Sequence, residues 1–151
     1  MLQNYSRQRE TRELANTLFD RAWWRGWWGR LFARFTSKPR HIPLLSEARE
    51  LLGTVSALPP QRRTIRVEHI IGSAGTLNFD CDFYPLYQRG RDRWVAVAQA
   101  MLDDPTNLPP IQAVQVGDHY YIVDGHHRVS VAKMLDYLYI DADLTVWSAA
   151  A

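Results

Sequence analysis

Residues 122–133 decide the fold expected for this chain. They read Ile122-Val123-Asp124-Gly125-His126-His127-Arg128-Val129-Ser130-Val131-Ala132-Lys133. The apolar residues before Asp124 predict a strand over residues 120–123, and the residues from Arg128 to Leu138 predict a helix. A strand that turns through a glycine into a helix leaves the first backbone N–H groups of that helix without partners. This junction is therefore the first candidate for a functional site.

The rest of the chain predicts an α+β fold with a small mixed sheet and packed helices. Further strands are expected over residues 64–71, 111–116 and 140–147, and Gly117-Asp118 predicts a hairpin turn. Helices are expected over residues 4–35 and 44–52, and around an apolar face formed by Trp94, Val97, Ala98, Met101 and Leu102. Pro59-Pro60 marks the expected boundary between an N-terminal helical extension, residues 1–60, and a domain, residues 61–148.

Composition places the chain among globular proteins. Of its 151 residues, 46% are hydrophobic and 23% are charged, which argues against disorder. No apolar run is long enough to span a bilayer, and the first residues do not form a secretory signal. Cys81 is the single cysteine, which excludes an intrachain disulfide and a cysteine-based zinc site. We expect a cytoplasmic protein.

Basic residues are concentrated at the N-terminus. Residues 1–40 carry nine Lys/Arg against three acidic residues, while the remaining residues carry nine against thirteen. Sixteen of the eighteen cations are arginines, which favours bidentate contacts with phosphate or carboxylate. A GC-rich coding sequence is the alternative explanation. The basic character therefore belongs to the extension and not to the domain.

Each residue of the junction has a role in an anion site. Unpaired N–H groups and the helix dipole attract an anion, and Gly125 lets the backbone approach it. Arg128 in the first turn can form bidentate hydrogen bonds with phosphate oxygens, and His126 or His127 adds a donor that is strongest when protonated. Asp124 repels phosphate, so its expected roles are to bind a sugar hydroxyl, to coordinate Mg²⁺ or to orient a histidine.

A purely structural interpretation of the junction stays open. In that interpretation Asp124 caps the helix and the two histidines are exposed to solvent. Zinc binding is disfavoured, because adjacent residues on a helix do not face the same way and thiolate partners are absent. We therefore assign no metal ligands, and a single histidine such as His69 or His119 is more often a packed or surface residue.

The order of these motifs resembles the ParB-like nuclease family. Leu108-Pro109-Pro110-Ile111, a hairpin, and the Gly125-His126-His127-Arg128 loop entering a helix match the Pro-Pro-Ile, hairpin and Gly-x-x-Arg order of that family. Val67-Glu68-His69-Ile70-Ile71 resembles the strand that opens the domain. The resemblance covers about half the chain, from Thr64 to Trp147, and implies a ParB/sulfiredoxin-like fold with a nucleotide or phosphate site at Gly125, His126, His127 and Arg128.

The loop of this chain differs from the loops of two well-known branches of the family, and these differences limit which activity the resemblance implies. ParB proteins that bind CTP carry Gly-Glu-Arg-Arg where this chain has Gly125-His126-His127-Arg128. Sulfiredoxins carry a catalytic cysteine where this chain has His126, which excludes their chemistry unless Cys81 supplies the thiol. The Asp-Gly-His-His-Arg form is most similar to a branch that includes free-serine kinases, in which an acidic residue near the first strand is the catalytic base.

The family resemblance implies both an activity and an alternative without turnover. In the first, Glu68 and Asp124 are the candidate catalytic residues for phosphoryl transfer from ATP, ADP or CTP with Mg²⁺; Asp80 and Asp82 are further carboxylates near the first strand. In the second, the domain is a nucleotide-sensing or nucleic-acid-associated module. We also expect a homodimer.

The extension contains an unusual mixture of tryptophan and arginine. Residues 23–35 read Trp23-Trp24-Arg25-Gly26-Trp27-Trp28-Gly29-Arg30-Leu31-Phe32-Ala33-Arg34-Phe35. We expect these tryptophans to pack on the domain or on a second subunit. Contact with an anionic membrane surface and binding of single-stranded nucleic acid are the alternatives.

Overall fold

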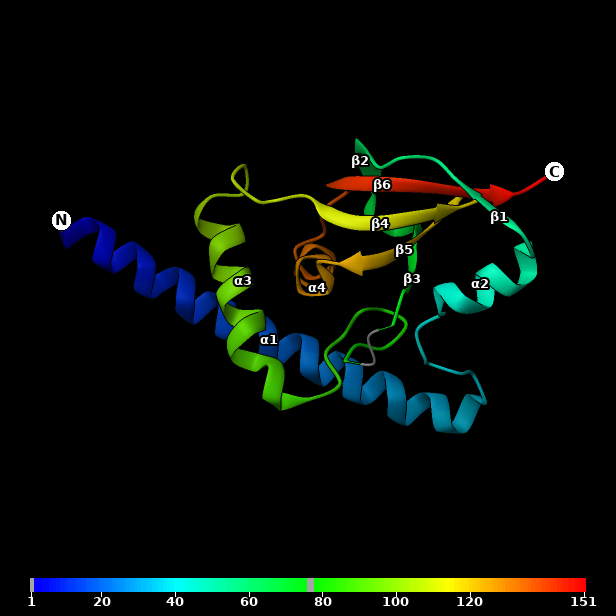
Figure 1. Cartoon of the computed structure of the whole chain (residues 1–151). Coiled ribbons are helices and arrows are strands. Elements are labelled where there is room, and N and C mark those ends of the chain that lie inside the picture. The colour runs from blue at the N-terminus through cyan, green and yellow to red at the C-terminus, as the bar shows by residue number, and fades with distance from the viewer. Residues whose placement is uncertain (1, 76–77) are drawn as a thin grey trace.

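One long helix and a mixed six-stranded sheet dominate the computed structural model (Figure 1). The structure describes residues 2–75 and 78–151. The helices are α1 (Leu2–Thr36), α2 (Leu45–Leu52), α3 (Arg91–Asp103) and α4 (His126–Met134). The strands are β1 (Val55–Ala57), β2 (Gln61–Arg66), β3 (Ile70–Ser73), β4 (Ile111–Val116), β5 (His119–Asp124) and β6 (Tyr139–Ala149). Two short 3₁₀ turns are η1 (Val67–His69) and η2 (Gln88–Gly90). The predicted α+β class is confirmed.

The sheet has the order β1-β6-β4-β5-β3, and β2 also pairs with β6. The β3–β5 and β4–β6 pairs are parallel, and the others are antiparallel. Only η1 separates β2 from β3 in the chain, although β2 pairs with β6 near one edge of the sheet and β3 forms the opposite edge. Four peptide steps span at most about 14 Å, whereas four strand spacings cover about 19 Å. The sheet must therefore curl so that these edges approach each other.

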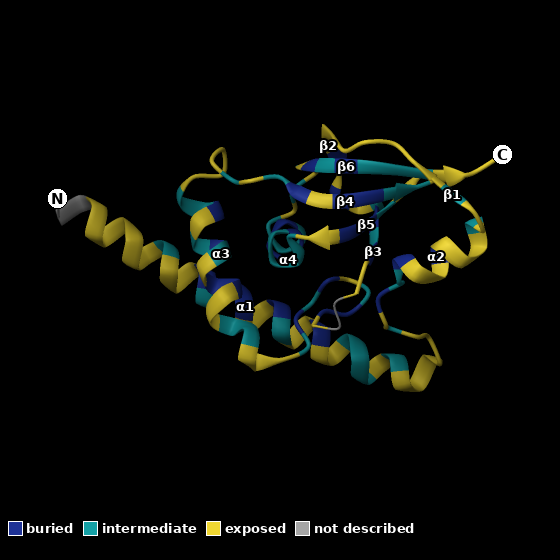
Figure 2. Ribbon diagram, viewed as in Figure 1, coloured by how far each residue is buried: buried dark blue, intermediate teal, exposed yellow. Residues whose placement is uncertain are grey.

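The helix α4 lies under one face of the sheet, with α1 and α3 on its other side (Figure 1). A first core lies between sheet and α4 and includes Ile65, Ile111, Ile122 and Val129. A second core joins the outer side of α4 to α1 and α3. The helix α2 covers part of the other face of the sheet. Burial follows these layers (Figure 2).

A buried hydrogen-bond chain links α3 and α4. The Trp94 Nε1–H donates to Ser130 Oγ at 2.8 Å, and the Ser130 hydroxyl donates to the carbonyl oxygen of Phe83 at 2.6 Å. Buried polar groups that find partners in this way avoid a desolvation cost of about 1–3 kcal/mol each. These two hydrogen bonds therefore fix α3 relative to α4. The first turn of α3 lies near the candidate site.

The sequence predictions for helices and strands are largely confirmed, but the strand β1 was not expected and two predicted ranges are corrected. The single strand expected over residues 64–71 is wrong, because the structure breaks it at η1 into β2 and β3. The helix expected over residues 128–138 begins earlier, at His126, and ends at Met134. The left-handed Gly117, with φ of 59°, forms the expected hairpin turn, and Gly53 ends α2.

The N-terminal segment is built into the fold. The strand β1 pairs with β6, and Ile42 is buried in the core beneath the sheet. Residues before Pro59-Pro60 thus contribute to the same sheet as residues after it. Among the described residues, none of the helices combines the length and the hydropathy needed to cross a lipid bilayer.

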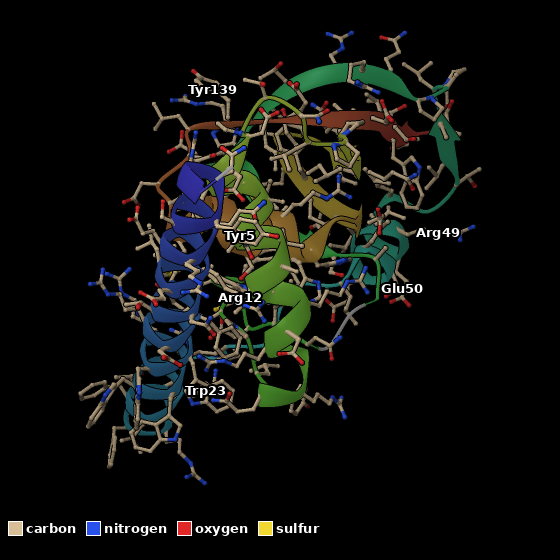
Figure 3. All side chains as sticks on the ribbon, turned by 90° about the vertical axis from the view of Figure 1, so that its left-hand side faces the viewer. Tyr5, Arg12, Trp23, Arg49, Glu50 and Tyr139 are labelled. Carbon is tan, nitrogen blue, oxygen red and sulfur yellow. The ribbon has the colours of Figure 1, made fainter. Side chains whose placement is uncertain are left out.

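The tryptophans of α1 do not share one environment. Trp23 packs against the core that α1 forms with α3 (Figure 3). Trp24, Trp27 and Trp28 are exposed by 54%, 40% and 49%. The expected packing on the domain therefore holds for Trp23 and fails for the other three within a single chain.

Candidate functional site

The junction between β5 and α4 is shaped by one glycine. Gly125 has φ of 100° and precedes the first residue of α4. A Cβ atom at this position would lie 2.6 Å from Ile111 Cγ2 and 3.0 Å from Arg128 Nη2. Both the left-handed backbone and this close approach exclude a larger residue. The expected glycine turn from strand to helix is confirmed.

Arg128 ties the junction to the start of β4. Its Nη1 donates to the carbonyl oxygens of Pro109 and Pro110, the latter at 2.8 Å. Its Nη2 donates to Asp124 Oδ2 at 3.0 Å. This guanidinium therefore has a structural role, which the sequence did not reveal because Pro109 and Pro110 lie 18 to 19 residues away in the chain.

No side chain of the described residues caps α4 at Gly125. Asp124 pairs with Arg128 and does not occupy the capping position, so the interpretation in which Asp124 only caps the helix is wrong. The first N–H groups of α4 consequently keep their capacity to bind an anion.

The His126 ring is held by hydrogen bonds. Its Nε2 lies 2.8 Å from Ser73 Oγ, and the ring also donates to the backbone carbonyl oxygen of Ile122. Burial lowers the pKa of His126. His126 therefore orients the loop and is neutral at pH 7.

The half-buried ring of His127 borders the space in front of the junction. It meets Phe79 edge-to-face, with ring centroids 5.2 Å apart. Burial lowers the pKa of His127 to about 4, and the neighbouring Arg93 and His126 act in the same direction. The neutral ring is a weaker donor to an anion than the protonated ring would be. His127 is a neutral ring that gains a proton only when an anion or a low pH favours it.

Two adjoining hollows surround His127. The first has a volume of about 240 Å³ and is lined by Asn78, Phe79, Arg93, Val97, Asp124, Gly125, His126, His127 and Arg128. The second, of about 210 Å³, is lined by Asn78, Phe79, Pro85, Tyr87, Arg89, Gly90, Arg93, Trp94 and His127. Four residues are common to both linings, so the hollows are neighbours and the junction opens into a larger polar space.

Arg93 is the functional candidate that the sequence reasoning missed. It is exposed on the first turn of α3, it lines both hollows, and it forms no ion pair with any residue that the structure describes. Its neighbour Arg91 is held by Asp20 at 2.6 Å, which fixes this turn against α1. The basic run from Arg89 to Arg93 was the available signal, but nothing local connected it to the junction.

Glu68 lies far from the junction. It occupies the exposed turn η1 and pairs with Arg66 at 3.1 Å. Because β3 and β5 are parallel, this turn lies near Tyr120 at the start of β5, whereas Asp124 ends it. The structure therefore does not bring Glu68 and Asp124 together. His69 stacks on Tyr120 at the same end, and His119 is exposed there, so neither joins the junction.

Asp80 and Asp82 belong to a different cluster. Asp80 is buried and accepts hydrogen bonds from the backbone N–H groups of Asp82 and Tyr84 and from Arg40. Burial raises the pKa of Asp80 against these contacts. Asp82 pairs with Arg40 at 2.6 Å. Both carboxylates stabilise the loop beside α1 and do not line the hollows at the junction.

Neither a metal site nor a similarity to known proteins assigns a function to these residues. Across residues 2–75 and 78–151, no group of three or more His, Cys, Asp or Glu side chains is placed to hold a metal ion. The sequence matches no protein-family model and no curated protein. The candidate site is therefore argued from its geometry.

The Gly125→Ala variant should destabilise the fold more than Gly117→Ala. Both glycines have positive φ, but only the Cβ at Gly125 meets packed atoms, while the Cβ at Gly117 meets nothing within 4 Å. We expect about 1 kcal/mol of destabilisation for Gly117→Ala and about 3 kcal/mol for Gly125→Ala, measured by urea unfolding. Equal losses would show that the approach to Ile111 is not a constraint.

Stability should fall with decreasing pH because of His127. Below pH 6.5 the unfolded chain protonates this ring, whereas the folded chain does so only near pH 4. The unfolded state therefore binds more protons in this window, and the free energy of unfolding decreases as the pH falls. The full difference between the folded and unfolded pKa of His127 corresponds to about 3 kcal/mol of unfolding free energy. Solvent around the half-buried ring reduces this contribution to about 1–2 kcal/mol. His127→Gln should make the free energy of unfolding less dependent on pH between 7 and 4, and His126, whose pKa is also lowered, keeps part of the dependence. Exposed His41→Gln should leave the dependence unchanged. An unaltered dependence for His127→Gln would refute the assignment.

Proposed function

We propose that this protein binds a nucleotide or another phosphorylated ligand in the hollow at Asp124–Arg128. One observation carries the proposal: the open N-terminus of α4, the ring of His127, and Arg93, which has no ion pair among the described residues, all border the same hollow. Helix N–H groups and a guanidinium are the donors that proteins use for phosphate. With Asp124 engaged by Arg128, the net potential at the hollow favours an anion.

Ligand binding and protonation are coupled at this site. An anion beside His127 favours the charged ring and so raises its pKa above the ligand-free value. The ring then becomes a second donor to the phosphate, in addition to Arg93. Binding should therefore be tighter near pH 6 than near pH 8. The lowered pKa keeps His127 from adding a third positive charge beside Arg93 and Arg128.

The size of the site suits a nucleotide. Small-molecule pockets commonly measure about 300–1,000 Å³, and the two adjoining hollows together fall in this range. The first hollow offers the anion donors, and the second adds the rings of Tyr87 and Trp94. Mg²⁺ is usually bound by one or two carboxylates together with substrate phosphates, and Asp124 is the carboxylate that borders the first hollow.

The ParB/sulfiredoxin-like fold is part of the same proposal. It is supported by the order of the elements: a hairpin of β4 and β5, the Gly125 turn, and α4 inside a curled mixed sheet. The DGHHR form of the loop supports the branch with phosphoryl-transfer activity. For that chemistry His127 borders the hollow and donates to the bound phosphate once it is protonated, whereas Ser73 is fully buried beside His126 and is not exposed to the hollow.

The second candidate is a sensor that binds a nucleotide, or associates with nucleic acid, without turnover. The pairing of Asp124 with Arg128 favours it, because no unpaired carboxylate remains among the described residues lining the hollow. General base catalysis by a carboxylate requires one within hydrogen-bond reach of the acceptor. An assay of phosphate release from ATP distinguishes the two candidates. If the wild type releases phosphate and His127→Gln does not, the protein is an enzyme. If ATP binds tightly and no phosphate is released, the protein is a sensor.

Arg93→Ala should separate ligand binding from folding. Loss of one charge-assisted contact costs about 1.5–3 kcal/mol, so the affinity for ATP or ADP with Mg²⁺ should drop by about one to two powers of ten in calorimetry. The melting temperature without ligand should stay unchanged, because Arg93 has no ion pair among the described residues. Arg12→Ala, an exposed arginine on α1, is the matched control and should leave affinity unchanged.

Arg128→Ala is the contrasting variant. It removes hydrogen bonds to Pro109, Pro110 and Asp124, so it should lower the melting temperature in the absence of ligand. Unchanged affinity in Arg93→Ala, or an Arg93→Ala effect matched by Arg12→Ala, would contradict the proposed site.

A further inference from the structure

The C-terminal half of α1 carries an aromatic stripe, which consists of Trp24, Trp27, Trp28, Phe32 and Phe35. Phe32 and Phe35 are exposed by 60% and 81%, and the three tryptophans by about half. With side chains of about 150–250 Å² each, these rings expose roughly 500 Å² of apolar surface. A patch of this size is at the upper end for a monomeric protein, and such patches often serve in binding.

The stripe lies on the side of α1 that faces away from the domain. At 3.6 residues per turn, its members fall on one side of the helix, opposite Ala22 and Gly26. Ala22 is fully buried, and a Cβ on Gly26 would lie 2.8 Å from Tyr84 Cβ. Side chains of this part of the helix project away from the rest of the ribbon, whereas Trp23 lies on the side of α3 (Figure 3). The domain therefore covers one side of the helix and leaves the stripe uncovered.

Unpaired cations border the stripe. Residues 21–40 contain six Lys/Arg and no acidic residue. Arg30 and Arg40 pair with Asp80, but Arg21, Arg25 and Arg34 have no ion pair within the described part of the chain. By helical position, Arg21 and Arg25 lie along one edge of the stripe and Arg34 along the other.

An open hollow of about 730 Å³ continues the basic edge of the stripe. Arg21, Arg25 and Arg40 line it together with Trp24 and Trp28. The two acidic residues in its lining are already engaged, Asp20 by Arg91 and Asp82 by Arg40. The face as a whole therefore complements a negatively charged surface.

We propose that this face of α1 lies on the surface of an anionic phospholipid bilayer. The indole rings suit the boundary between headgroups and acyl chains, and the bordering arginines suit lipid phosphates. The helix lies along the surface and does not enter the bilayer end-on. The buried side of α1 stays packed on the domain, so the bound protein keeps the fold described above.

The two other occupants fit less well. A second copy packed stripe to stripe brings the arginine rows together, and residues 21–40 offer no acidic side chain to neutralise them. Single-stranded nucleic acid is bound in grooves where bases stack on free ring faces. Here Trp27 meets Trp24 and Trp28 edge-to-face at 5.7 and 5.0 Å, so these rings already cover part of the faces on which bases would stack.

The test uses the full chain and sucrose-loaded vesicles. Vesicles of phosphatidylcholine with 30 mole per cent phosphatidylglycerol are compared with vesicles of phosphatidylcholine alone, by co-sedimentation and by tryptophan emission. We expect binding to the anionic vesicles at least tenfold stronger than to the neutral ones, a shift of the emission to shorter wavelength, and weakening by salt.

Two variants and two matched controls assign the binding to this face. Trp24→Ala/Trp28→Ala/Phe32→Ala should lower the partition constant more than tenfold, and Arg21→Gln/Arg25→Gln/Arg34→Gln should lower it by about 100-fold. The controls Tyr5→Ala/Leu14→Ala and Arg9→Gln/Arg12→Gln change exposed residues of the same helix outside the stripe and should change it less than twofold. Circular dichroism checks that each variant stays folded.

Several outcomes would overturn the proposal. They are equal binding to neutral vesicles, no binding at low salt, and losses in the control variants that match those in the stripe variants. A concentration-dependent dimer that buries the tryptophans, or quenching by an oligonucleotide without vesicle binding, would assign the stripe to a different partner.

Discussion

The contact of Arg128 with Pro109, Pro110 and Asp124 is the interaction on which the candidate site depends. It joins the beginning of β4, the end of β5 and the first turn of α4 at one point. Gly125 makes the contact geometrically feasible, because its missing side chain lets the turn pass against Ile111. Without this junction, α4 would not begin where its N–H groups meet the hollow.

The remaining parts of the site are set by packing at longer range. Ser73 at the end of β3 fixes the His126 ring, which leaves His127 to face the hollow. Arg93 is brought there by α3, which is held by α1 through Arg91 and by α4 through Trp94. The donors thus come from two helices that meet only in the folded chain. The long helix α1 contributes to this arrangement on one side and presents the aromatic stripe on the other.

Local signals in the sequence predicted what local physics controls. The helical spacing of Trp94, Ala98 and Met101 located α3, and the glycines at 117 and 125 located the turns. Pairing partners were out of reach of such signals. The β-branched run over residues 64–71 gave no indication that its first half pairs with β6 and its second half with β5. The same break placed Glu68 at the wrong end of the sheet for a role beside Asp124, and no pattern indicated that Arg93 would approach His127.

The central claim is that the junction binds phosphate, and a nuclear magnetic resonance titration tests it most directly. The amide signals of residues 125–128 and the ring signals of His127 would be followed as ADP with Mg²⁺ is added at pH 6.5. We expect these signals and that of Arg93 to shift together with one saturating curve, and the pKa of His127 to rise on binding. Shifts confined to other parts of the chain, or a His127 pKa that does not change at saturation, would contradict the account.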